Sequence, residues 1–365
     1  GARSFLHGAT RDWVVELDVV LSGGERVTVG GERPAPPPFA ALARRLEPRA
    51  DTSRPRWPEV RKNSSGYALD RFLPGADPVQ LLVGSEGTLG LVLGLTLRLV
   101  EAPARRGVVL MGLGTLDDLP EATAEARRRG ASACELFGRR ILDMARLDDD
   151  PHVGPVSRGC EALLLLEVEG GPDTVEDGLE HLRRLADVLG RGHVEARTGE
   201  ERRRLWGVRH RASPTIAGAA ERGRVSTQFI EDSVVPPARV ADYARGVGRI
   251  LDEAGLDGVI FGHAGDGHLH VNPLVDMGDP GWRDRVREVL YATADLVSDL
   301  GGTLSGEHGD GRVRAPLLER IWGPTWSRAF RHVKEALDPA GVLNPGVILP
   351  LPGQDPMEGL GAGMP

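Results

Sequence analysis

The chain reads Phe261-Gly262-His263-Ala264-Gly265-Asp266-Gly267-His268-Leu269-His270-Val271-Asn272 in its last third. This pattern predicts a strand over 258–261, a turn over 264–267 and a return strand over 268–275. Because residues two apart on a strand share a face, we expect His268, His270 and Asn272 on one side of the hairpin. Ordinary hairpin polarity would explain one lone histidine. The density of histidines and acids in glycine-rich turns favours a functional site.

A second cluster follows and reads Gly301-Gly302-Thr303-Leu304-Ser305-Gly306-Glu307-His308-Gly309. Imidazole and carboxylate suit zinc and its first-row neighbours, and two histidines plus a carboxylate leave an open position for chemistry. The preceding segment predicts a helix with Asp279 at its N-cap and Gly301 at its end. Glu307 and His308 are therefore expected on a loop just beyond a helix, where they can face the hairpin.

The composition describes a globular protein without a membrane span. The 365 residues leave room for two or three domains, and no apolar run approaches the roughly 20 residues that cross a bilayer. The net charge of −8 argues against nucleic acid as a partner. Only Cys134 and Cys160 occur, so neither a disulfide framework nor an iron–sulfur cluster is encoded.

The periodicity of apolar residues predicts an α+β fold. Before a candidate boundary at Pro103, it predicts a hairpin of strands 14–21 and 26–29, a helix over 39–46, an irregular segment over 48–78 and a strand over 91–100. After the boundary it predicts strand 107–113, helix 116–129, strand 132–137, strand 162–168, helix 174–189 and strand 193–197. Two strand–helix–strand units side by side indicate a ferredoxin-like antiparallel sheet.

Two further motifs complete a family pattern. They read Gly84-Ser85-Glu86-Gly87-Thr88-Leu89-Gly90 and Leu337-Asp338-Pro339-Ala340-Gly341-Val342-Leu343-Asn344-Pro345-Gly346. Together with the two clusters, in this order, they resemble the FAD-linked 2-hydroxy-acid dehydrogenases, which are flavoproteins of the vanillyl-alcohol oxidase type. The resemblance covers residues 1 to about 349. It implies a partial FAD-binding domain over 1–102, a substrate domain with an antiparallel sheet over 103–299, a return to the FAD domain over 300–350 and a flexible tail over 351–365.

The resemblance also implies roles for individual residues. It implies a divalent metal, zinc or manganese, on His263, His270 and Glu307, with His308 as the catalytic base. The implied substrate contacts are Arg209, Ser213, His268 and Asn272. The implied FAD contacts are Thr10, Gly84, Ser85, Glu86, Gly87, Gly90 and Asn344.

Arg209 has a competing interpretation. A guanidinium group offers a planar fork of donors to a substrate carboxylate. Arg209 stands close in sequence to Arg202, Arg203, Arg204 and Arg211, however, and such crowding is also typical of a solvated basic helix face.

The implied reaction is the oxidation of a D-2-hydroxy acid, of the D-lactate, glycolate or D-2-hydroxyglutarate class, to the 2-oxo acid with hydride transfer to FAD. A metal that chelates the carboxylate and hydroxyl groups lowers the hydroxyl pKa, and an imidazole such as His308 can remove the proton near neutral pH. Residues 228–233 lack a lysine that helps to bind the second carboxylate in the 2-hydroxyglutarate enzymes, which disfavours that substrate.

Relatives carry a glycine-rich loop for the FAD pyrophosphate upstream of the segment that resembles Gly1 to Thr10, and this sequence has no equivalent. We therefore expect either a fragment that lacks an N-terminal half or a second chain that supplies it, with a homodimer as one arrangement. The expected electron acceptor is a cytochrome, a quinone or an electron-transfer flavoprotein. The expected location is the cytoplasm or the inner face of a membrane. A flavin-free metal protein or hydrolase, and a non-catalytic fragment, remain alternatives, which the motif at 84–90 disfavours.

Overall fold

The computed structural model describes residues 1–46, 57–218, 223–358 and 360. The chain divides into two compact units. Unit 1 comprises Gly1–Gly8, Glu59–Lys62 and Glu101–Gly302, and unit 2 comprises Ala9–Pro58, Asn63–Val100 and Thr303–Pro365. The sequence predicts one domain for 1–102, whereas residues 1–8, 59–62 and 101–102 of that segment belong to unit 1.

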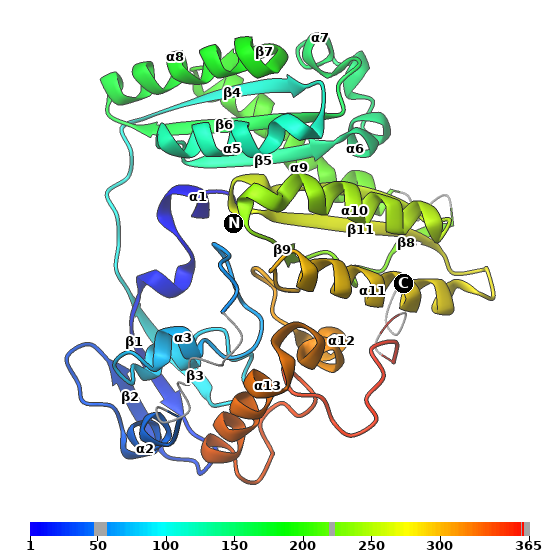
Figure 1. Cartoon of the computed structure of the whole chain (residues 1–365). Helices are drawn as coiled ribbons and strands as arrows, with labels where there is room; N and C mark the ends of the chain where they lie inside the picture. Colours follow the sequence, from blue (N-terminus) through cyan, green and yellow to red (C-terminus); the bar gives the residue numbers. More distant parts are fainter. Residues whose placement is uncertain (47–56, 219–222, 359, 361–365) are drawn as a thin grey trace. The chain divides into compact units, whose positions relative to one another are not determined.

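Unit 1 is built on a large antiparallel sheet (Figure 1), which has eight strands among the described residues. The strands are β4 (Arg105–Leu113), β5 (Ala133–Gly138), β6 (Ala162–Gly170), β7 (Gly190–Ala196), β8 (Arg224–Ser226), β9 (Ser233–Val234), β10 (Asp257–His263) and β11 (His268–Asp276). Their order is β7-β4-β6-β5-β10-β11-β8, and β9 also pairs with β11. The first four strands have the ferredoxin-like order, which confirms that prediction.

Helices cover both faces of this sheet. One face carries α5 (Leu119–Arg128), α8 (Pro172–Leu189) and α10 (Val240–Glu253), and α11 (Trp282–Asp299) packs against α10. The other carries α6 (Arg139–Met144), α7 (Gly154–Ser157) and α9 (Gly199–Ala217). A short helix, α1 (Ser4–His7), precedes them. The expectation of Asp279 as an N-cap is wrong, because α11 has Gly281 at its N-cap and the Asp279 carboxylate accepts the Gly281 amide instead.

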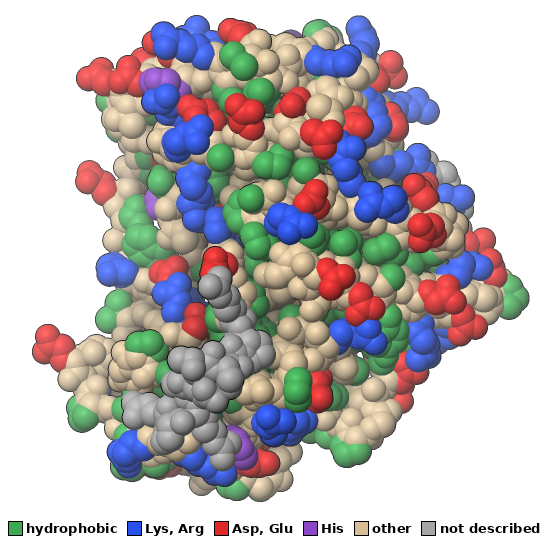
Figure 2. All heavy atoms as spheres, viewed as in Figure 1, with side chains coloured by type: hydrophobic (Ala, Val, Ile, Leu, Met, Phe, Trp, Pro, Cys, Tyr) green, Lys and Arg blue, Asp and Glu red, His purple; other side chains and the backbone are tan. Residues whose placement is uncertain are grey.

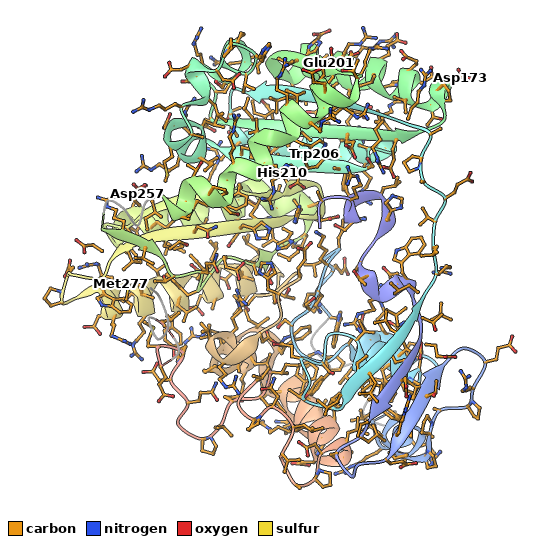
Figure 3. The ribbon with its side chains drawn as sticks, turned by 180° about the vertical axis from the view of Figure 1, so that it is seen from behind. Asp173, Glu201, Trp206, His210, Asp257 and Met277 are labelled. Atoms are coloured by element: carbon orange, nitrogen blue, oxygen red, sulfur yellow. The ribbon has the colours of Figure 1, made fainter. Side chains whose placement is uncertain are left out.

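The helix α9 crosses the sheet face that carries the histidines, with Trp206 and His210 along it (Figure 3). Its start is encoded by a capping box, in which the Thr198 hydroxyl accepts the Glu201 amide and the Glu201 carboxylate accepts the Thr198 amide. Its buried residues recur every three or four positions and are Leu205, Val208, Ala212 and Ile216. They pack on strand side chains such as Val108, Leu165 and Phe261, so α9 is fixed against the sheet by apolar contact.

Unit 2 contains a three-stranded sheet of order β2-β1-β3 and several helices. Its elements are β1 (Val14–Val20), β2 (Arg26–Gly30), α2 (Pro37–Leu46), α3 (Leu69–Phe72), α4 (Pro78–Leu82), β3 (Leu91–Leu97), α12 (Gly311–Arg314) and α13 (Leu318–Leu337). The core packs Tyr67, Trp322 and Phe330 edge to face.

The sequence predictions for unit 2 hold in part. Residues 48–56 of the expected irregular segment lie outside the described residues, and α3 forms within the rest of it. The expected tail, 351–365, also lies partly outside the described residues, but Met357 within it is buried.

Candidate functional site

The hairpin β10–β11 brings three histidine rings together. Cross-strand pairing sets Phe261 opposite His270 and His263 opposite His268. The three ring centroids lie 4.7 to 5.2 Å apart. Only glycine fits at position 267 in the turn, because its φ is +71° and a Cβ there would stand 2.0 Å from the Val235 carbonyl oxygen. The turn sequence therefore determines how closely the rings approach.

Two of the histidines are held so that their Nε2 atoms face each other. The Nδ1 atom of His263 lies 2.6 Å from a carboxylate oxygen of Glu135, and the Nδ1 atom of His270 lies 2.9 Å from the Glu231 carbonyl oxygen. Both partners accept hydrogen bonds, so both Nδ1 atoms donate and the Nε2 lone pairs point inward. The two Nε2 atoms are 3.4 Å apart.

This donor set fits a divalent metal ion. Two nitrogens bound to one ion at about 2.0–2.1 Å with a tetrahedral angle are about 3.4 Å apart. Metal-binding histidines commonly donate their other N–H to a carboxylate or a backbone carbonyl, which is the arrangement of His263 and His270. Two inward lone pairs repel each other unless a cation lies between them. The ligating atoms of His263, His268 and His270 all lie within 4.8 Å of one another.

His268 has a different environment from its neighbours. Its Nε2 atom lies 2.8 Å from the Asp232 carboxylate, and both side chains are fully buried. Burial lowers the pKa of His268 to about 4, with a further decrease from His270, although the hydrogen bond to Asp232 opposes the shift. The ring is therefore neutral at pH 7. Asn272, on the same side of the hairpin, is buried and accepts a hydrogen bond from the Ser226 hydroxyl.

The arginines of α9 separate into two groups. Arg202 donates to the backbone carbonyls of Arg106 and Arg197, Arg204 contacts Glu200, and Arg211 contacts Asp150. These contacts fit the interpretation as a helix surface. Arg209 instead donates from Nε to the Glu135 carboxylate at 3.1 Å, and its Cζ lies 4.8 Å from the centre of the Phe261 ring.

Ser213 stands one turn after Arg209 on α9 and is exposed. The structure thus brings Arg209, but not the other four arginines, to the carboxylate that orients His263. It does not enclose Ser213 among the buried groups.

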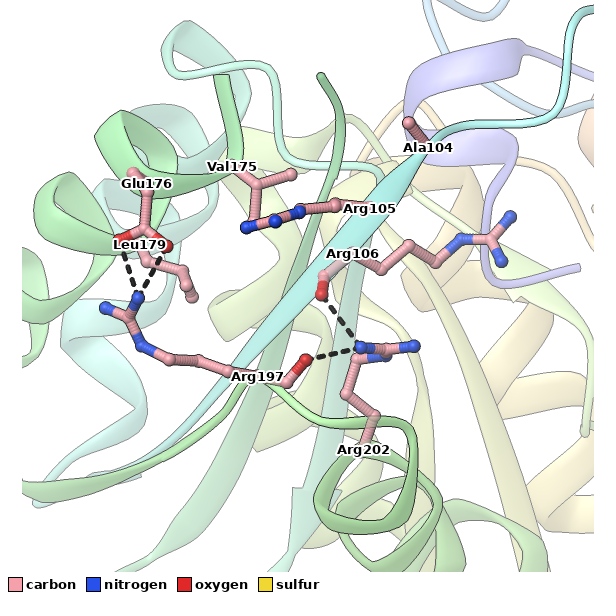
Figure 4. A pocket seen from close by; sticks show the side chains of 8 residues that line it. All are labelled: Ala104, Arg105, Arg106, Val175, Glu176, Leu179, Arg197 and Arg202. Carbon is pink, nitrogen blue, oxygen red and sulfur yellow. Dashed lines mark hydrogen bonds and ion pairs between the residues drawn. The ribbon is translucent and has the colours of Figure 1, made fainter. Parts of the chain in front are cut away.

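A pocket of about 190 Å³ lies elsewhere in unit 1 (Figure 4). It is lined by Arg105, Arg106, Arg197 and Arg202 together with Ala104, Val175, Glu176 and Leu179. Arg197 forms an ion pair with Glu176, and Arg106 with Glu169. None of the site residues predicted from the sequence lines this pocket.

A buried carboxylate braces the turn of the histidine hairpin. Asp266 is 1% exposed and accepts hydrogen bonds from Ser4 Oγ at 2.8 Å and Arg61 Nε at 2.8 Å. The ammonium group of Lys62, itself buried, lies 3.2 Å from Asp266 Oδ2, the oxygen that also accepts from Ser4. Burial would raise the pKa of Asp266, but Lys62, Arg61 and Ser4 together lower it. The turn between His263 and His268 is thus fixed by a charged network.

Glu307 and His308 belong to a loop of unit 2 that is held at several points. The Ser305 hydroxyl accepts the Gly309 amide at 2.7 Å, and Ser64 donates to the carbonyls of Ser305 and Gly306. Within this loop Glu307 is half-buried and His308 is exposed. As the sequence predicts, both stand on a loop beyond α11.

The motif at 84–90 forms a brace in unit 2. The Glu86 carboxylate accepts the amides of Asp310 and Gly311 at 2.7 and 3.0 Å, and the Asn344 side chain donates to the Glu86 carbonyl. Ser85 is buried, and Thr10 is exposed at the start of a 3-10 turn, Thr10–Trp13. The side chain of Glu86 therefore orders the loop after His308, a role that the motif does not suggest.

Sequence reasoning missed the residues that orient the predicted ones. These are Glu135, Glu231, Asp232, Arg61, Lys62 and Asp266. The signal for Glu135 was a carboxylate inside an apolar strand, Ala133-Cys134-Glu135-Leu136-Phe137, and the signal for Asp232 was an acidic pair before Val234. A charged residue at a buried strand position needs a partner.

The surface adds little to these assignments. Acidic and basic side chains intermingle over the face shown in Figure 2. Among the described residues, the structure has no helix with the length and apolar character to span a bilayer.

Comparison with known proteins identifies the family. Residues 102–348 match the family described as FAD linked oxidases, C-terminal domain. D-lactate dehydrogenase of Archaeoglobus fulgidus is 31% identical over 96% of this chain, glycolate oxidase subunit GlcD of Bacillus subtilis 28% over 95%, and D-2-hydroxyglutarate dehydrogenase of Pseudomonas putida 31% over 95%. The chain spans 67%, 65% and 37% of these relatives, respectively.

The fold has counterparts among solved structures. The structure of p-cresol methylhydroxylase with substrate bound has a TM-score of 0.60 over 93% of this chain and 66% of that one, at 14% identity. At that identity the likeness concerns the fold, which is that of the vanillyl-alcohol oxidase type flavoproteins, as the sequence predicts. On the family match and these relatives, the chain belongs to the FAD linked oxidases and contains their C-terminal domain.

Proposed function

We propose that this protein takes part in the oxidation of a D-2-hydroxy acid to the 2-oxo acid, with FAD as the hydride acceptor and a divalent metal, zinc or manganese, in the substrate site. The observation that carries the proposal is the pair of His263 and His270 Nε2 atoms, 3.4 Å apart, with both Nδ1 atoms bound to acceptors. The names of the relatives support the substrate class, which includes D-lactate, glycolate and D-2-hydroxyglutarate.

Arg209 is suited to hold the substrate carboxylate. Its Nε is used by Glu135, and within the described part of the chain its two terminal nitrogens make no hydrogen bond. A carboxylate can take both of them in a bidentate pair. The Phe261 ring beneath the guanidinium group restricts its orientation. Asn272, His268 and Ser213 are proposed as further substrate contacts.

Glu307 and His308 complete the proposed mechanism through their motif. By their motif positions, Glu307 would supply the third metal ligand and His308 would accept the proton of the substrate hydroxyl group. A divalent ion, when bound, would lower the pKa of that hydroxyl group, and a bound flavin would accept the hydride. Arg209 and Asn272 orient the substrate so that its Cα–H bond points in one fixed direction.

The FAD contacts are proposed at Thr10, Gly84, Ser85, Glu86, Gly87, Gly90 and Asn344. Gly87 has a φ of +70° with open space beside its Cα, so a cofactor can approach its backbone closely.

Strand β3 supports the involvement of further polypeptide. Its sheet edge is unpaired within the described residues, and between 43% and 85% of each apolar side chain is exposed at Leu91, Val92, Leu93, Leu95, Leu97, Leu99 and Val100. The part of the relatives that this chain does not match is the proposed cover. The electron acceptor is proposed to be a separate cytochrome, quinone or electron-transfer flavoprotein.

The first test is metal content. Protein purified without chelator should hold about one zinc or manganese ion per chain by elemental analysis, and His263→Ala combined with His270→Ala should remove it. Metal-free wild-type protein, or an unchanged metal content in the double variant, would overturn the metal site.

The second test is flavin reduction. The chain is loaded with FAD, or co-expressed with a polypeptide that corresponds to the unmatched part of the relatives. The resulting yellow protein should be bleached by a D-2-hydroxy acid and not by the L enantiomer. A metal-containing protein that acquires no flavin in either format would instead favour the hydrolase alternative, in which the metal activates water.

A further inference from the structure

Glu135 connects two of the proposed site residues that come from different elements. It stands on β5, where it is fully buried. One carboxylate oxygen accepts His263 Nδ1 from β10 at 2.6 Å, and the other accepts Arg209 Nε from α9 at 3.1 Å. Within the described residues these are its side-chain partners. Each oxygen therefore has one partner, and each partner belongs to the proposed site.

The strand register explains this placement. Strands β5 and β10 pair with Phe261 opposite Phe137 and Gly262 opposite Leu136. The same antiparallel register sets His263 beside Glu135. Side chains of β5 alternate between faces, so Glu135 shares the face of Phe137, which packs beneath α9. The carboxylate thus lies between a strand and the helix that covers it.

The contact with His263 selects the state of the imidazole. One Glu135 oxygen lies 2.6 Å from His263 Nδ1, and the other accepts from Arg209 Nε. Because both carboxylate oxygens accept, the His263 proton resides on Nδ1 and the lone pair on Nε2. Second-shell carboxylates of this kind fix the tautomer and the ring orientation of metal ligands.

The contact with Arg209 restricts the guanidinium group. Glu135 binds the Nε atom of Arg209, and the Phe261 ring lies against one face of the guanidinium group. A ligand can therefore bind only at the end of the group that carries the two terminal nitrogens. A bidentate carboxylate must then approach end-on. Because one carboxylate binds both partners, the distance between the two ligand-binding groups is fixed as well.

We propose that Glu135 is a positioning residue that sets the spacing between the metal ion and the substrate carboxylate, by holding His263 with one oxygen and Arg209 with the other. This inference rests on the proposed function. It makes the site specific for a ligand whose carboxylate lies next to its metal-binding oxygen, as in a 2-hydroxy acid, because a longer spacer between the two groups would not match both anchors.

The test uses Glu135→Gln, whose amide has a single acceptor oxygen and must lose one of the two contacts. The matched control is Glu167→Gln. Glu167 is a buried carboxylate on β6 of the same sheet, bound by Arg3 and by the Trp206 indole N–H, and it touches neither His263 nor Arg209. Both variants remove one buried negative charge, so a general loss of stability should affect both.

Cobalt titration of metal-free protein, followed by visible absorption, measures the first effect. We expect Glu135→Gln to bind cobalt about 10- to 100-fold more weakly than wild-type protein, and Glu167→Gln to stay within about threefold. Nitrogen-15 NMR of the histidine rings in metal-free protein should show the Nδ1–H tautomer of His263 in wild-type protein and its loss in Glu135→Gln only. In the flavin-loaded protein the KM for D-2-hydroxy acid should rise more than kcat falls.

The outcomes separate the two hypotheses. Wild-type protein that binds no cobalt would overturn the proposed metal site itself. Cobalt binding by wild-type protein with equal affinity in both Gln variants, together with an unchanged His263 tautomer and an unchanged KM for the D-2-hydroxy acid, would overturn the role of Glu135 alone. If Glu135→Gln does not fold, Glu135→Asp decides, because it keeps both acceptor oxygens on a shorter side chain. It should retain the tautomer and show a smaller loss of cobalt affinity, and a wild-type affinity there contradicts the inference.

Discussion

Glu86→Ala should loosen the loop that carries Glu307 and His308. The Glu86 carboxylate accepts the backbone amides of Asp310 and Gly311 at 2.7 and 3.0 Å. Asp310 is buried, so its amide has no ready replacement partner in water after the substitution. The Gly309 backbone lies directly above the carboxylate, since a Cβ there would stand 2.5 Å from the Glu86 Cδ. The substitution therefore leaves a gap as well as two unpaired amides.

The size of the effect follows from these two bonds. A hydrogen bond to a charged group contributes about 1.5–3 kcal/mol. Two such bonds would amount to about 3–6 kcal/mol, and because Glu86 is half-buried we expect about 2–4 kcal/mol after solvent screening. At about 1.4 kcal/mol for each factor of ten, the loop should open about 30- to 1,000-fold more often.

Amide hydrogen exchange followed by mass spectrometry measures this opening directly. Peptides that span 305–311 should exchange faster in Glu86→Ala by the stated factor, and Glu86→Gln, which keeps one acceptor, should lie between. Glu25→Ala is the control, because Glu25 is exposed in the hairpin of unit 2. If 305–311 exchange at the same rate in Glu86→Ala and Glu25→Ala while FAD affinity falls, Glu86 acts on the cofactor and the brace has no role.

Three further predictions concern the same chain. In the flavin-loaded enzyme, Glu307→Gln should lose metal and raise KM, whereas His308→Asn should keep metal and lower kcat by about 10²–10⁴, and metal-free His308→Asn would contradict the assignment of the base. Burial, opposed by a backbone hydrogen bond and reinforced by a nearby carboxylate, raises the pKa of Asp310 from 3.8 to about 7. The folded state therefore holds this proton more tightly than the unfolded state does, so the free energy of unfolding should decrease as pH rises from 3.8 through 7. Urea midpoints measured across this pH range test the prediction. If the midpoint of Asp310→Asn depends on pH as that of wild-type protein does, Asp310 is not the cause. The 365-residue chain alone should bind FAD weakly, and isolation of this chain with stoichiometric flavin would disprove that.

The sequence predicted the hairpin of the site well because its evidence is local. Alternating apolar and polar residues with glycines at the turn indicate β10 and β11, and the polar face of β11 follows directly from the period of two. The ferredoxin-like order was predictable for the same reason, since each strand and helix is encoded in its own segment. The family motifs then directed attention to His263, His270 and Arg209.

The supporting groups could not be predicted in this way because their contacts are not local. Glu135 and Arg209 are 74 residues apart, and Glu135 and His263 are 128 residues apart. Such pairs depend on strand register and on the packing of α9, which a single sequence does not specify. The contacts of the Glu86 carboxylate with the amides of Asp310 and Gly311 were missed for the same reason, because a motif identifies a residue and leaves its side-chain partners open.

The bracing of Asp266 by Arg61 and Lys62 has a consequence for how the protein is made. The chain passes between the two units five times, after residues 8, 58, 62, 100 and 302. Arg61 leaves the ribosome 205 residues before the turn that it stabilises. During synthesis, Arg61 and Lys62 are therefore made long before their buried anion. The histidine hairpin can reach its final geometry only after residues 59–62, which lie between two segments of unit 2 in the sequence, have joined unit 1. Deletion of residues 1–102 would retain every predicted metal ligand and would still remove Arg61 and Lys62, the two cations that hold the turn between His263 and His268.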